Sequence, residues 1–478
     1  MSKALAGGHP VLGTGRLGER AVVVLLVLLC AVPMLVLAWL RLQLQAPAGD
    51  EPHYLIISQA IEMYGSLDVQ RVYDSHDYSA FYPLPIEPHT SPGPSGLPLP
   101  LHSVGGPVLW LIPFLLGGRA GAVAFMVAVS LLIVANVYWL CRELEVGRWT
   151  AFAVGLAFGL GTPVLTYSSM TFVEPIGALV CVYALRVLHQ GRLRTRDLLL
   201  VSASLGVLPW VHSRFLLFPV AFLTFVLIRL GREEGRHARR FLWATGPAAV
   251  LLLGFEAYNL LMWHTLDVAP NQVNVGAVPF QNNPLSVLAA VALDQRVGFL
   301  ANFPIFLLVL PGVLFMASRR WTSLHVHVLA AVVPYTLVIC SFPAWEGAWS
   351  PPARFMAVVL PMLAGYVGVA LQRGSAVVVS ALACAAVVYA GVLTTLAIFT
   401  HDGGFSAPRP AGGARVPPGA DSLDLTRFVP SAGIDEQQAL FVAWTAALIG
   451  VAVFVRMVGH DQPREPPSRG ADGGCRGS

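Results

Sequence analysis

The stretch Gly49-Asp50-Glu51-Pro52-His53-Tyr54 lies just beyond the first long apolar segment of the chain, residues 21–40. Two adjacent carboxylates are therefore expected to leave the membrane where the chain enters its first long loop. The rest of the sequence predicts a membrane scaffold that holds this loop over a cavity. The headgroup boundary also tolerates charge that has no function, so charge alone leaves both interpretations open.

Composition places the chain among polytopic membrane proteins. Of its 478 residues, 56% are hydrophobic and 12% are charged, whereas soluble globular proteins have about 25% charged residues. Apolar runs long enough to cross a bilayer recur along the chain. The formal net charge of +4 is small and dispersed, which excludes a nucleic-acid-binding protein. We therefore expect an all-α polytopic membrane protein with one integral membrane domain.

That domain is predicted over residues 21–456, with about twelve transmembrane helices. The segments are residues 21–40, 120–141, 149–168, 172–189, 197–211, 215–230, 241–263, 298–317, 323–342, 354–371, 375–400 and 437–456. With the N-terminal tail, residues 1–20, in the cytoplasm, most Lys and Arg residues fall in cytoplasmic loops, as the positive-inside rule requires. The C-terminal tail, residues 457–478, is then cytoplasmic and is expected to be disordered. Cleavage of the first segment as a signal sequence stays open.

The predicted outer loops are residues 42–104, 264–297 and 401–436. In the first of them, residues 51–64 predict a short amphipathic helix that lies in the membrane interface. The proline-rich residues 65–104 predict a loop that is ordered but irregular. Residues 104–117 are apolar but too short to cross the bilayer, which favours a re-entrant segment over the alternative of a spanning helix.

With this topology, the unusual polar residues gather at the outer ends of helices. Charged side chains at membrane depth are costly, and they usually face a polar cavity or a partner. The gathering therefore predicts a site that opens outward. Its members lie in or beside several outer loops and are Asp50, Glu51, Glu174, His212, Arg214, Arg296, Glu346 and Arg354.

These motifs resemble the GT-C superfamily of membrane glycosyltransferases, which use polyprenyl-phosphate sugars and include protein O-mannosyltransferases and lipid A aminoarabinose transferases. The resembling segments are Asp50-Glu51, residues 104–117, Glu174-Pro175, Asp294 to Gly298 with Asn302-Phe303-Pro304, and Trp345-Glu346-Gly347 with Arg354. The resemblance covers roughly residues 20–372. The sequence departs from it at Pro351-Pro352-Ala353, where related chains more often have Gly or Ser before the Arg.

The resemblance implies transfer of a sugar, with inversion, from a polyprenyl-phosphate donor to an extracytoplasmic acceptor, which is a cell-envelope glycan, lipid or protein. By the same resemblance Asp50 is the general base, and Glu51 is its catalytic neighbour or a contact to a metal or the acceptor. Arginine suits the lipid phosphate because its donors match phosphate oxygens. The residues expected to bind substrate are His53, Tyr54, Glu174, His212, Arg214, Arg296, Glu346 and Arg354.

Several alternatives stay open. One alternative is a transporter or flippase for a lipid-linked sugar, which would carry its charges near the bilayer midplane. Another is a non-catalytic membrane assembly subunit. The arginines could simply extend to the headgroups. A divalent cation, Mg²⁺, Mn²⁺ or Ca²⁺, is compatible with Asp50 and Glu51 because hard cations prefer carboxylate oxygens. The histidines of the first loop, His53, His76, His89 and His102, match no recognised metal site and are expected to be ordinary polar loop residues.

The expected location is the plasma membrane, with many spans, both termini in the cytoplasm and the active site outside. The expected partners are the polyprenyl-phosphate sugar, the acceptor and the lipid bilayer, and no nucleic acid.

Overall fold

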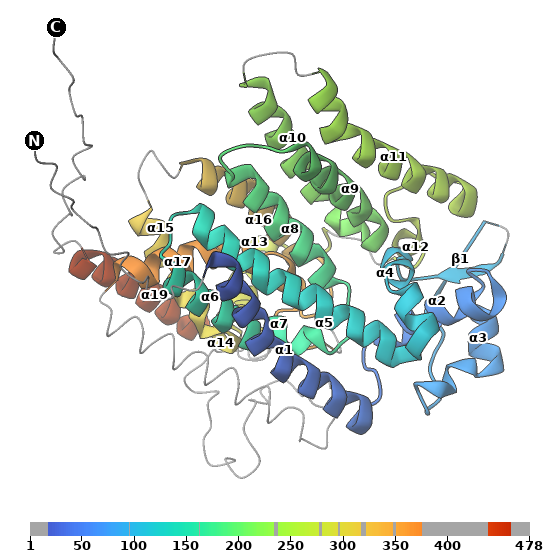
Figure 1. Ribbon diagram of the computed structural model, residues 1–478. Helices are drawn as coiled ribbons and strands as arrows, with labels where there is room; N and C mark the ends of the chain where they lie inside the picture. Colours follow the sequence, from blue (N-terminus) through green and yellow to red (C-terminus); the bar gives the residue numbers. More distant parts are fainter. Residues whose placement is uncertain are drawn as a thin grey trace, which may run out of the picture.

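A computed structural model describes residues 18–94, 96–161, 163–233, 238–276, 280–294, 297–316, 322–347, 350–374 and 438–459. These residues form a helical protein in which the elements of the first loop gather at one end of a bundle of longer helices (Figure 1). The predicted span 375–400 and the predicted outer loop 401–436 lie outside the described residues, as do the outermost parts of both tails.

The centre of the bundle is the long helix α5. Helix α5 covers Leu111–Glu143. The other helices of this group are α1 (Glu19–Leu44), α6 (Arg148–Leu160), α7 (Val164–Ser168) and α8 (Glu174–His189). Helix α5 packs against α1, α6 and α8. Between helices in a membrane, van der Waals packing replaces the hydrophobic effect, and small residues let backbones approach. A Cβ at Gly155 of α6 would lie 2.6 Å from Leu26 Cδ2 of α1, so glycine permits that contact.

A second group of helices lies side by side with this centre (Figure 1). It comprises α9 (Thr195–Val211), the 3₁₀ turn η2 (Ser213–Leu216), α10 (Leu217–Gly231) and α11 (Ala238–Trp263). A Cβ at Gly206 of α9 would be 2.8 Å from Ala248 Cα of α11, and Trp210 Nε1 donates to Leu251 O at 2.9 Å. These contacts fix the end of α9, where His212 follows.

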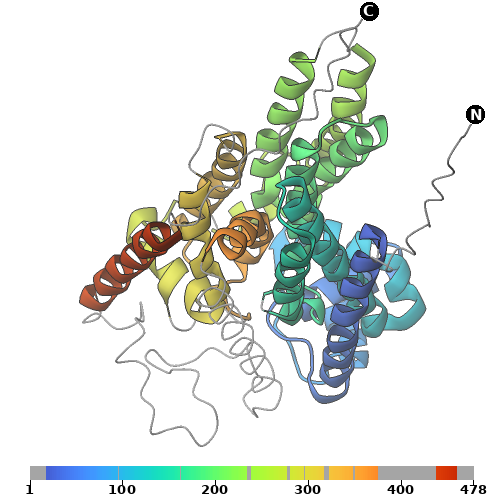
Figure 2. The same cartoon turned by 60° about the vertical axis from the view of Figure 1, so that its left-hand side comes forward.

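The third group is broken into short helices. Its elements are α12 (Pro270–Val273), α13 (Pro284–Leu293), α14 (Phe299–Asn302), η3 (Pro304–Leu308), α15 (Val309–Phe315), α16 (Thr322–Ser341), η5 (Phe355–Val358), η6 (Leu360–Leu363), α17 (Ala364–Arg373) and α19 (Gln438–Gly459). Helix α19, the red helix of Figure 2, packs against α15. Prolines such as Pro304 and Pro361 begin new turns here because they cannot donate an N–H to a continuing helix.

The predicted spans 298–317 and 354–371 are divided into short helices of this kind. The predicted span 149–168 is likewise divided, since α6 ends at Leu160 and α7 begins at Val164. The segment predicted as the outer loop 264–297 contains the short helices α12 and α13.

Five helices in the described part of the chain are long and apolar enough to cross a membrane: Glu19–Leu44, Leu111–Glu143, Ser213–Gly231, Ala238–Trp263 and Ser323–Ser341. They support the prediction of a membrane protein. The count of twelve and the side on which each loop lies stay predictions.

The first loop contains more regular secondary structure than its prolines suggest. It contains α2 (Glu51–Tyr64), α3 (Val69–Ser75), η1 (Asp77–Ala80), the antiparallel strands β1 (Thr90–Pro92) and β2 (Pro98–Pro100), and α4 (Gly105–Leu109). The expectation of an irregular loop over residues 65–104 is therefore wrong in part. The helix predicted at 51–64 is present as α2, with Pro52 in its first turn and Gly65 at its C-cap with φ 60°, but residues 51–60 are buried in the protein.

The segment 104–117 ends at a break inside α5. Gly117 and Gly118 have non-helical backbone angles, and Gly118 has φ 55° and ψ −139°, which glycine adopts readily. A Cβ at Gly121 would overlap the carbonyl oxygen of Pro113, so the chain bends sharply before the long part of α5. A Cβ at Gly105 would similarly overlap the backbone of Trp210, so α4 lies directly against the end of α9.

Candidate functional site

Asp50 begins the site because it is the residue immediately before α2. Gly49 turns the chain with φ 59°, and Asp50 takes the N-cap position without using its side chain as a cap. Its carboxylate instead accepts a hydrogen bond through Oδ2 from Arg354 Nη2. The Asp50 side chain is 23% exposed, so this charge is held at the edge of the protein interior.

Glu174 connects Arg354 to a second arginine. Its Oε1 atom accepts from Arg354 Nε at 2.9 Å and from Arg214 Nη2 at 2.6 Å. Glu174 is fully buried at the first turn of α8, where the positive end of the helix dipole favours a carboxylate. The result is a network of two carboxylates and two guanidinium groups whose charges balance, as buried charges require.

The backbone around Arg354 holds its side chain in place. Gly347 has φ 86°, and a Cβ there would lie 3.0 Å from Arg354 Cβ, so only glycine fits. Ala353 has φ 54°, a left-handed conformation that glycine adopts without strain. This explains why a small residue such as Gly suits the position before the arginine. The Phe172 ring lies under the guanidinium, 4.6 Å from Arg354 Cζ.

His212 holds Arg214 from the other side. Its side chain accepts from the Arg214 backbone N–H at 3.3 Å, and its Nε2 atom lies 3.1 Å from Arg214 Nη1. Gln272 Nε2 from α12 approaches the same His212 nitrogen at 3.3 Å. Phe355 covers Arg214, with its ring 4.5 Å from Cζ. Arg214 is therefore oriented by three separate elements of the chain.

These residues line one cavity of about 480 Å³, within the usual size range of small-molecule sites. Its lining includes the polar and charged side chains of Asp50, His102, His212, Arg214 and Arg354. It also includes apolar side chains from the end of α16, from α12 and from neighbouring loops, among them Val338, Ile339, Phe342, Val273 and Val268. The cavity thus joins paired cationic groups and a carboxylate to an apolar surface.

Burial by itself raises the pKa of Asp50, but the positive charge of Arg354 and the hydrogen bond from it lower that pKa well below its usual range. Asp50 is therefore ionised at neutral pH. Burial lowers the pKa of His102 to about 4, so this neighbour of Asp50 in the cavity is neutral at the same pH.

Three histidines of the first loop, His53, His89 and His102, form a cluster beside Asp50, while the fourth, His76, is exposed. The rings of His53 and His89 stack with centroids 3.6 Å apart, and His89 Nδ1 lies 3.0 Å from His102 Nε2. His53 Nδ1 lies 2.8 Å from the Tyr73 hydroxyl, which also accepts the His89 backbone N–H at 3.3 Å. Burial lowers the pKa of His53 and that of His89. The expectation that these histidines are ordinary polar loop residues does not fit this packing.

Glu51 points away from the cavity lining. Its Oε2 atom accepts from Arg41 Nη2 at 3.3 Å and from the Ala48 N–H at 3.1 Å, and its Oε1 atom accepts from the Thr171 N–H at 2.9 Å. Its side chain is 1% exposed. The adjacent carboxylates therefore lie in different surroundings, and Glu51 joins α1, α2 and the segment before α8.

The remaining candidate residues are Tyr54, Glu346 and Arg296, and none of them joins the hydrogen-bond network of Asp50, Glu174, Arg214 and Arg354 in the described part of the chain. Tyr54 is buried, with its ring 4.9 Å from that of His102. Glu346 is exposed beside a small cavity of about 10 Å³ that Arg354 also lines. Arg296 lies outside the described residues. Sequence reasoning missed Gln272 because it belongs to α12, which was not expected.

No protein-family model matches the sequence, and no curated protein matches it. Among solved structures, the chain is similar to an apo oligosaccharyltransferase from Archaeoglobus fulgidus, with 14% identity over 84% of this chain and a TM-score of 0.42. It is also similar to AglB from that organism, in complex with an inhibitory peptide and a dolichol-phosphate, with 13% identity over 87% of this chain and a TM-score of 0.45. The chain spans about three fifths of these two proteins, 61% and 60%.

A further similar structure is apo ArnT from Cupriavidus metallidurans, with 15% identity, a TM-score of 0.46, and coverage of 91% of this chain and 76% of ArnT.

Proposed function

We propose that this protein is an integral membrane glycosyltransferase that moves a sugar from a polyprenyl-phosphate donor to an extracytoplasmic acceptor. One observation supports the proposal most strongly. A carboxylate, Asp50, and two arginines, Arg214 and Arg354, line the same cavity, and that cavity also has an apolar wall. A phosphate-linked lipid needs cationic donors for its head and an apolar surface for its chain.

In this proposal the donor phosphate binds at the arginine pair. Guanidinium groups match phosphate oxygens with several donors at once, and they stabilise the charge that grows as the bond to the sugar breaks. The apolar side chains Val338, Ile339 and Phe342 then contact the first part of the polyprenyl chain. Glu174, buried between the arginines, is a positioning residue that sets the spacing of the two cationic groups.

Asp50 takes the proton from the acceptor hydroxyl. The acceptor oxygen forms a bond to the anomeric carbon, the bond from that carbon to the phosphate oxygen breaks, and polyprenyl phosphate leaves with the bonding electrons. A single displacement of this kind inverts the anomeric centre. The assigned roles are general base for Asp50, phosphate contacts for Arg214 and Arg354, and a structural contact for Glu51.

The ion pair between Asp50 and Arg354 makes the proposed proton transfer depend on donor binding. While Arg354 donates to Asp50, the carboxylate is a weak base, because its pKa is low. A bound phosphate competes with Asp50 for Arg354. Donor binding is therefore expected to raise the pKa of Asp50, so that the base becomes effective only when the donor is present.

The direct test is incubation of membranes containing the protein with a panel of radiolabelled polyprenyl-phosphate sugars. The wild-type protein is expected to release polyprenyl phosphate and form a labelled glycoside with at least one donor, and Asp50→Ala is expected to abolish the product. Movement of the lipid-linked sugar across the bilayer without any glycosidic product would instead favour a transporter. Binding of the donor without product or movement would favour an assembly subunit.

The extracytoplasmic position of the site is tested by labelling. Ser79 is exposed in the first loop, so Ser79→Cys is expected to react with a membrane-impermeant maleimide in intact cells. Reaction at position 79 only after lysis would place the loop in the cytoplasm and contradict the proposal.

A further inference from the structure

A β-hairpin brings two histidines of the first loop together. His89 is the residue before β1, and His102 follows β2 by two residues. In the antiparallel register Thr90 pairs with Pro100, and the Leu101 N–H donates to the His89 carbonyl at 3.1 Å, which extends the pairing. The imidazoles of His89 and His102 consequently meet, with Nδ1 and Nε2 3.0 Å apart.

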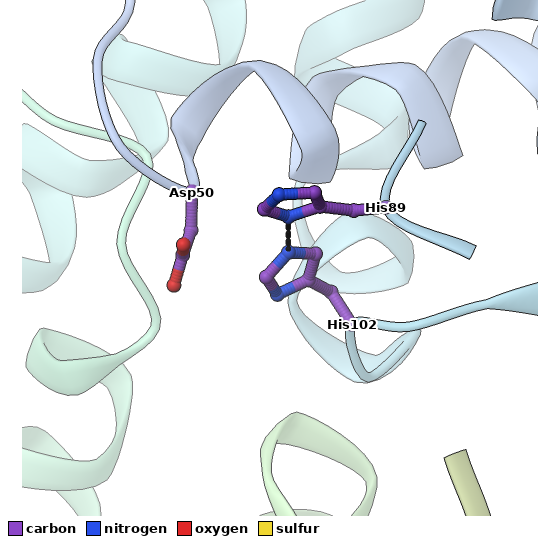
Figure 3. A group of neighbouring side chains, drawn as sticks. All are labelled: Asp50, His89 and His102. Carbon is purple, nitrogen blue, oxygen red and sulfur yellow. Dashed lines mark hydrogen bonds between the residues drawn. The ribbon is translucent and has the colours of Figure 1, made fainter. Parts of the chain in front are cut away.

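Asp50 faces this pair from the start of α2 (Figure 3). One ligand atom from each of Asp50, His89 and His102 lies within 4.8 Å of the others, and all three residues are half-buried. The three groups come from two elements, α2 and the hairpin, that are held together by His53, whose ring stacks on His89. The Tyr73 hydroxyl contacts His53 Nδ1 and the His89 backbone, so it supports both rings.

The distances suit a small tetrahedral ion. Zn–N bonds of about 2.0–2.1 Å place two nitrogen ligands about 3.4 Å apart in a tetrahedral site, and the present 3.0 Å separation needs to widen by only a few tenths of an ångström. The proton now shared by the two rings moves to another ring nitrogen when both lone pairs bind metal.

We propose that Asp50, His89 and His102 bind a divalent transition metal ion of the Zn²⁺ type. Two imidazole nitrogens and one carboxylate oxygen are a ligand set for zinc or a similar metal, whereas Mg²⁺ and Ca²⁺ prefer oxygen ligands alone. Three protein ligands leave a fourth position open, as in zinc sites that take part in chemistry. The site differs from the one expected from the sequence, because both Glu51 oxygens are occupied by Arg41, Ala48 and Thr171.

The open position lies toward the cavity, since Asp50 and His102 both line it. A metal there would lower the pKa of an acceptor hydroxyl, a role that rests on the proposed function; the binding of metal does not. Arg354 holds Asp50 by Oδ2, which leaves the other oxygen of the same carboxylate for the metal.

The test measures metal rather than activity. The purified full-length protein in detergent is treated with a chelator, dialysed against Zn²⁺ or Mg²⁺, and analysed for bound metal. We expect one Zn²⁺ per chain, no comparable binding of Mg²⁺, and an affinity at least about 10-fold lower in His89→Ala and His102→Ala, the loss typical even of outer-shell partners. His76→Asn is the matched control, because His76 is an exposed histidine of the same loop with φ 58°, a conformation that Asn tolerates.

A second variant protects the test against misfolding. In His89→Cys, bound Co²⁺ is expected to show the charge-transfer absorption of a cobalt–thiolate bond. The Co²⁺-loaded wild-type protein, which has the same six native cysteines, is the reference, so a band present only in the variant shows that position 89 is a ligand. Sub-stoichiometric Zn²⁺ in the wild type, unchanged affinity in both alanine variants, or no thiolate band in a folded His89→Cys protein would each overturn the metal site. None of these results affects the proposed transfer, whose test is the glycoside product.

Discussion

Asp50 and Glu51 are adjacent carboxylates with opposite surroundings. Asp50 lines a cavity of about 480 Å³ and accepts from Arg354 at its edge. Glu51 is sealed in the scaffold, where Arg41 and two backbone N–H groups use both of its oxygens. The first turn of a helix directs neighbouring side chains about 100° apart, so one carboxylate of the pair lines the cavity and the other is buried in the scaffold. Adjacency in sequence is no guide to shared function here.

The largest expected effect is at Asp50. Asp50→Asn keeps the shape of the side chain but removes the base, and general bases contribute about 10²–10⁴-fold to rate. We expect kcat for sugar transfer to fall by that factor while the affinity for the donor stays within a few fold. A steady-state assay with a radiolabelled donor measures both. Loss of donor affinity without loss of kcat would place Asp50 in binding instead.

Glu51→Gln is expected to lower the stability of the protein, in contrast to Asp50→Asn, which is expected to lower the rate. It leaves Arg41 as a buried charge without its partner, a change that costs roughly 3–5 kcal/mol in buried pairs. The expected result is a lower thermal unfolding midpoint in detergent. Glu62→Gln is the matched control, because Glu62 lies exposed on the same helix. Equal midpoints for the two variants would remove the structural role of Glu51.

Arg214→Gln tests the cationic end of the cavity. Removal of a donor that stabilises developing charge costs about 10²–10³-fold in rate, and we expect that loss in kcat/KM together with weaker binding of polyprenyl phosphate. Arg71→Gln, in which an exposed arginine of the same outer region is neutralised, should leave both quantities unchanged. If the two variants behaved alike, general charge and not the cavity would explain the effect.

The smallest effect is expected at Ala353. Its left-handed φ of 54° costs an alanine about 1–2 kcal/mol, while glycine loses part of that gain through its freedom in the unfolded chain. Ala353→Gly is therefore expected to raise stability by less than about 1 kcal/mol and to leave donor binding unchanged. A calorimetric midpoint below that of the wild type would show that the backbone there is not strained.

Some of this arrangement was predictable. The helix over residues 51–64, with Pro52 in its first turn, was predicted and is present as α2. The predicted group of polar residues included Asp50, Glu174, Arg214 and Arg354, which the structure joins by hydrogen bonds. The burial of Glu51 was not predictable, because it depends on the Thr171 N–H, 120 positions away in the chain. The meeting of His89 and His102 depends on the register of a hairpin whose short strands contain Pro92, Pro98 and Pro100, and proline is depleted in strands.

The division between the two carboxylates is tested most directly by single-turnover sugar transfer, expressed per folded molecule, in Asp50→Asn and Glu51→Gln side by side. We predict that Asp50→Asn is folded and binds donor but forms product at least about 100-fold more slowly than the wild type. We predict that the surviving folded fraction of Glu51→Gln transfers at close to the wild-type rate. Full transfer by Asp50→Asn, or a slow rate per folded molecule in Glu51→Gln with Asp50→Asn unaffected, would contradict the account.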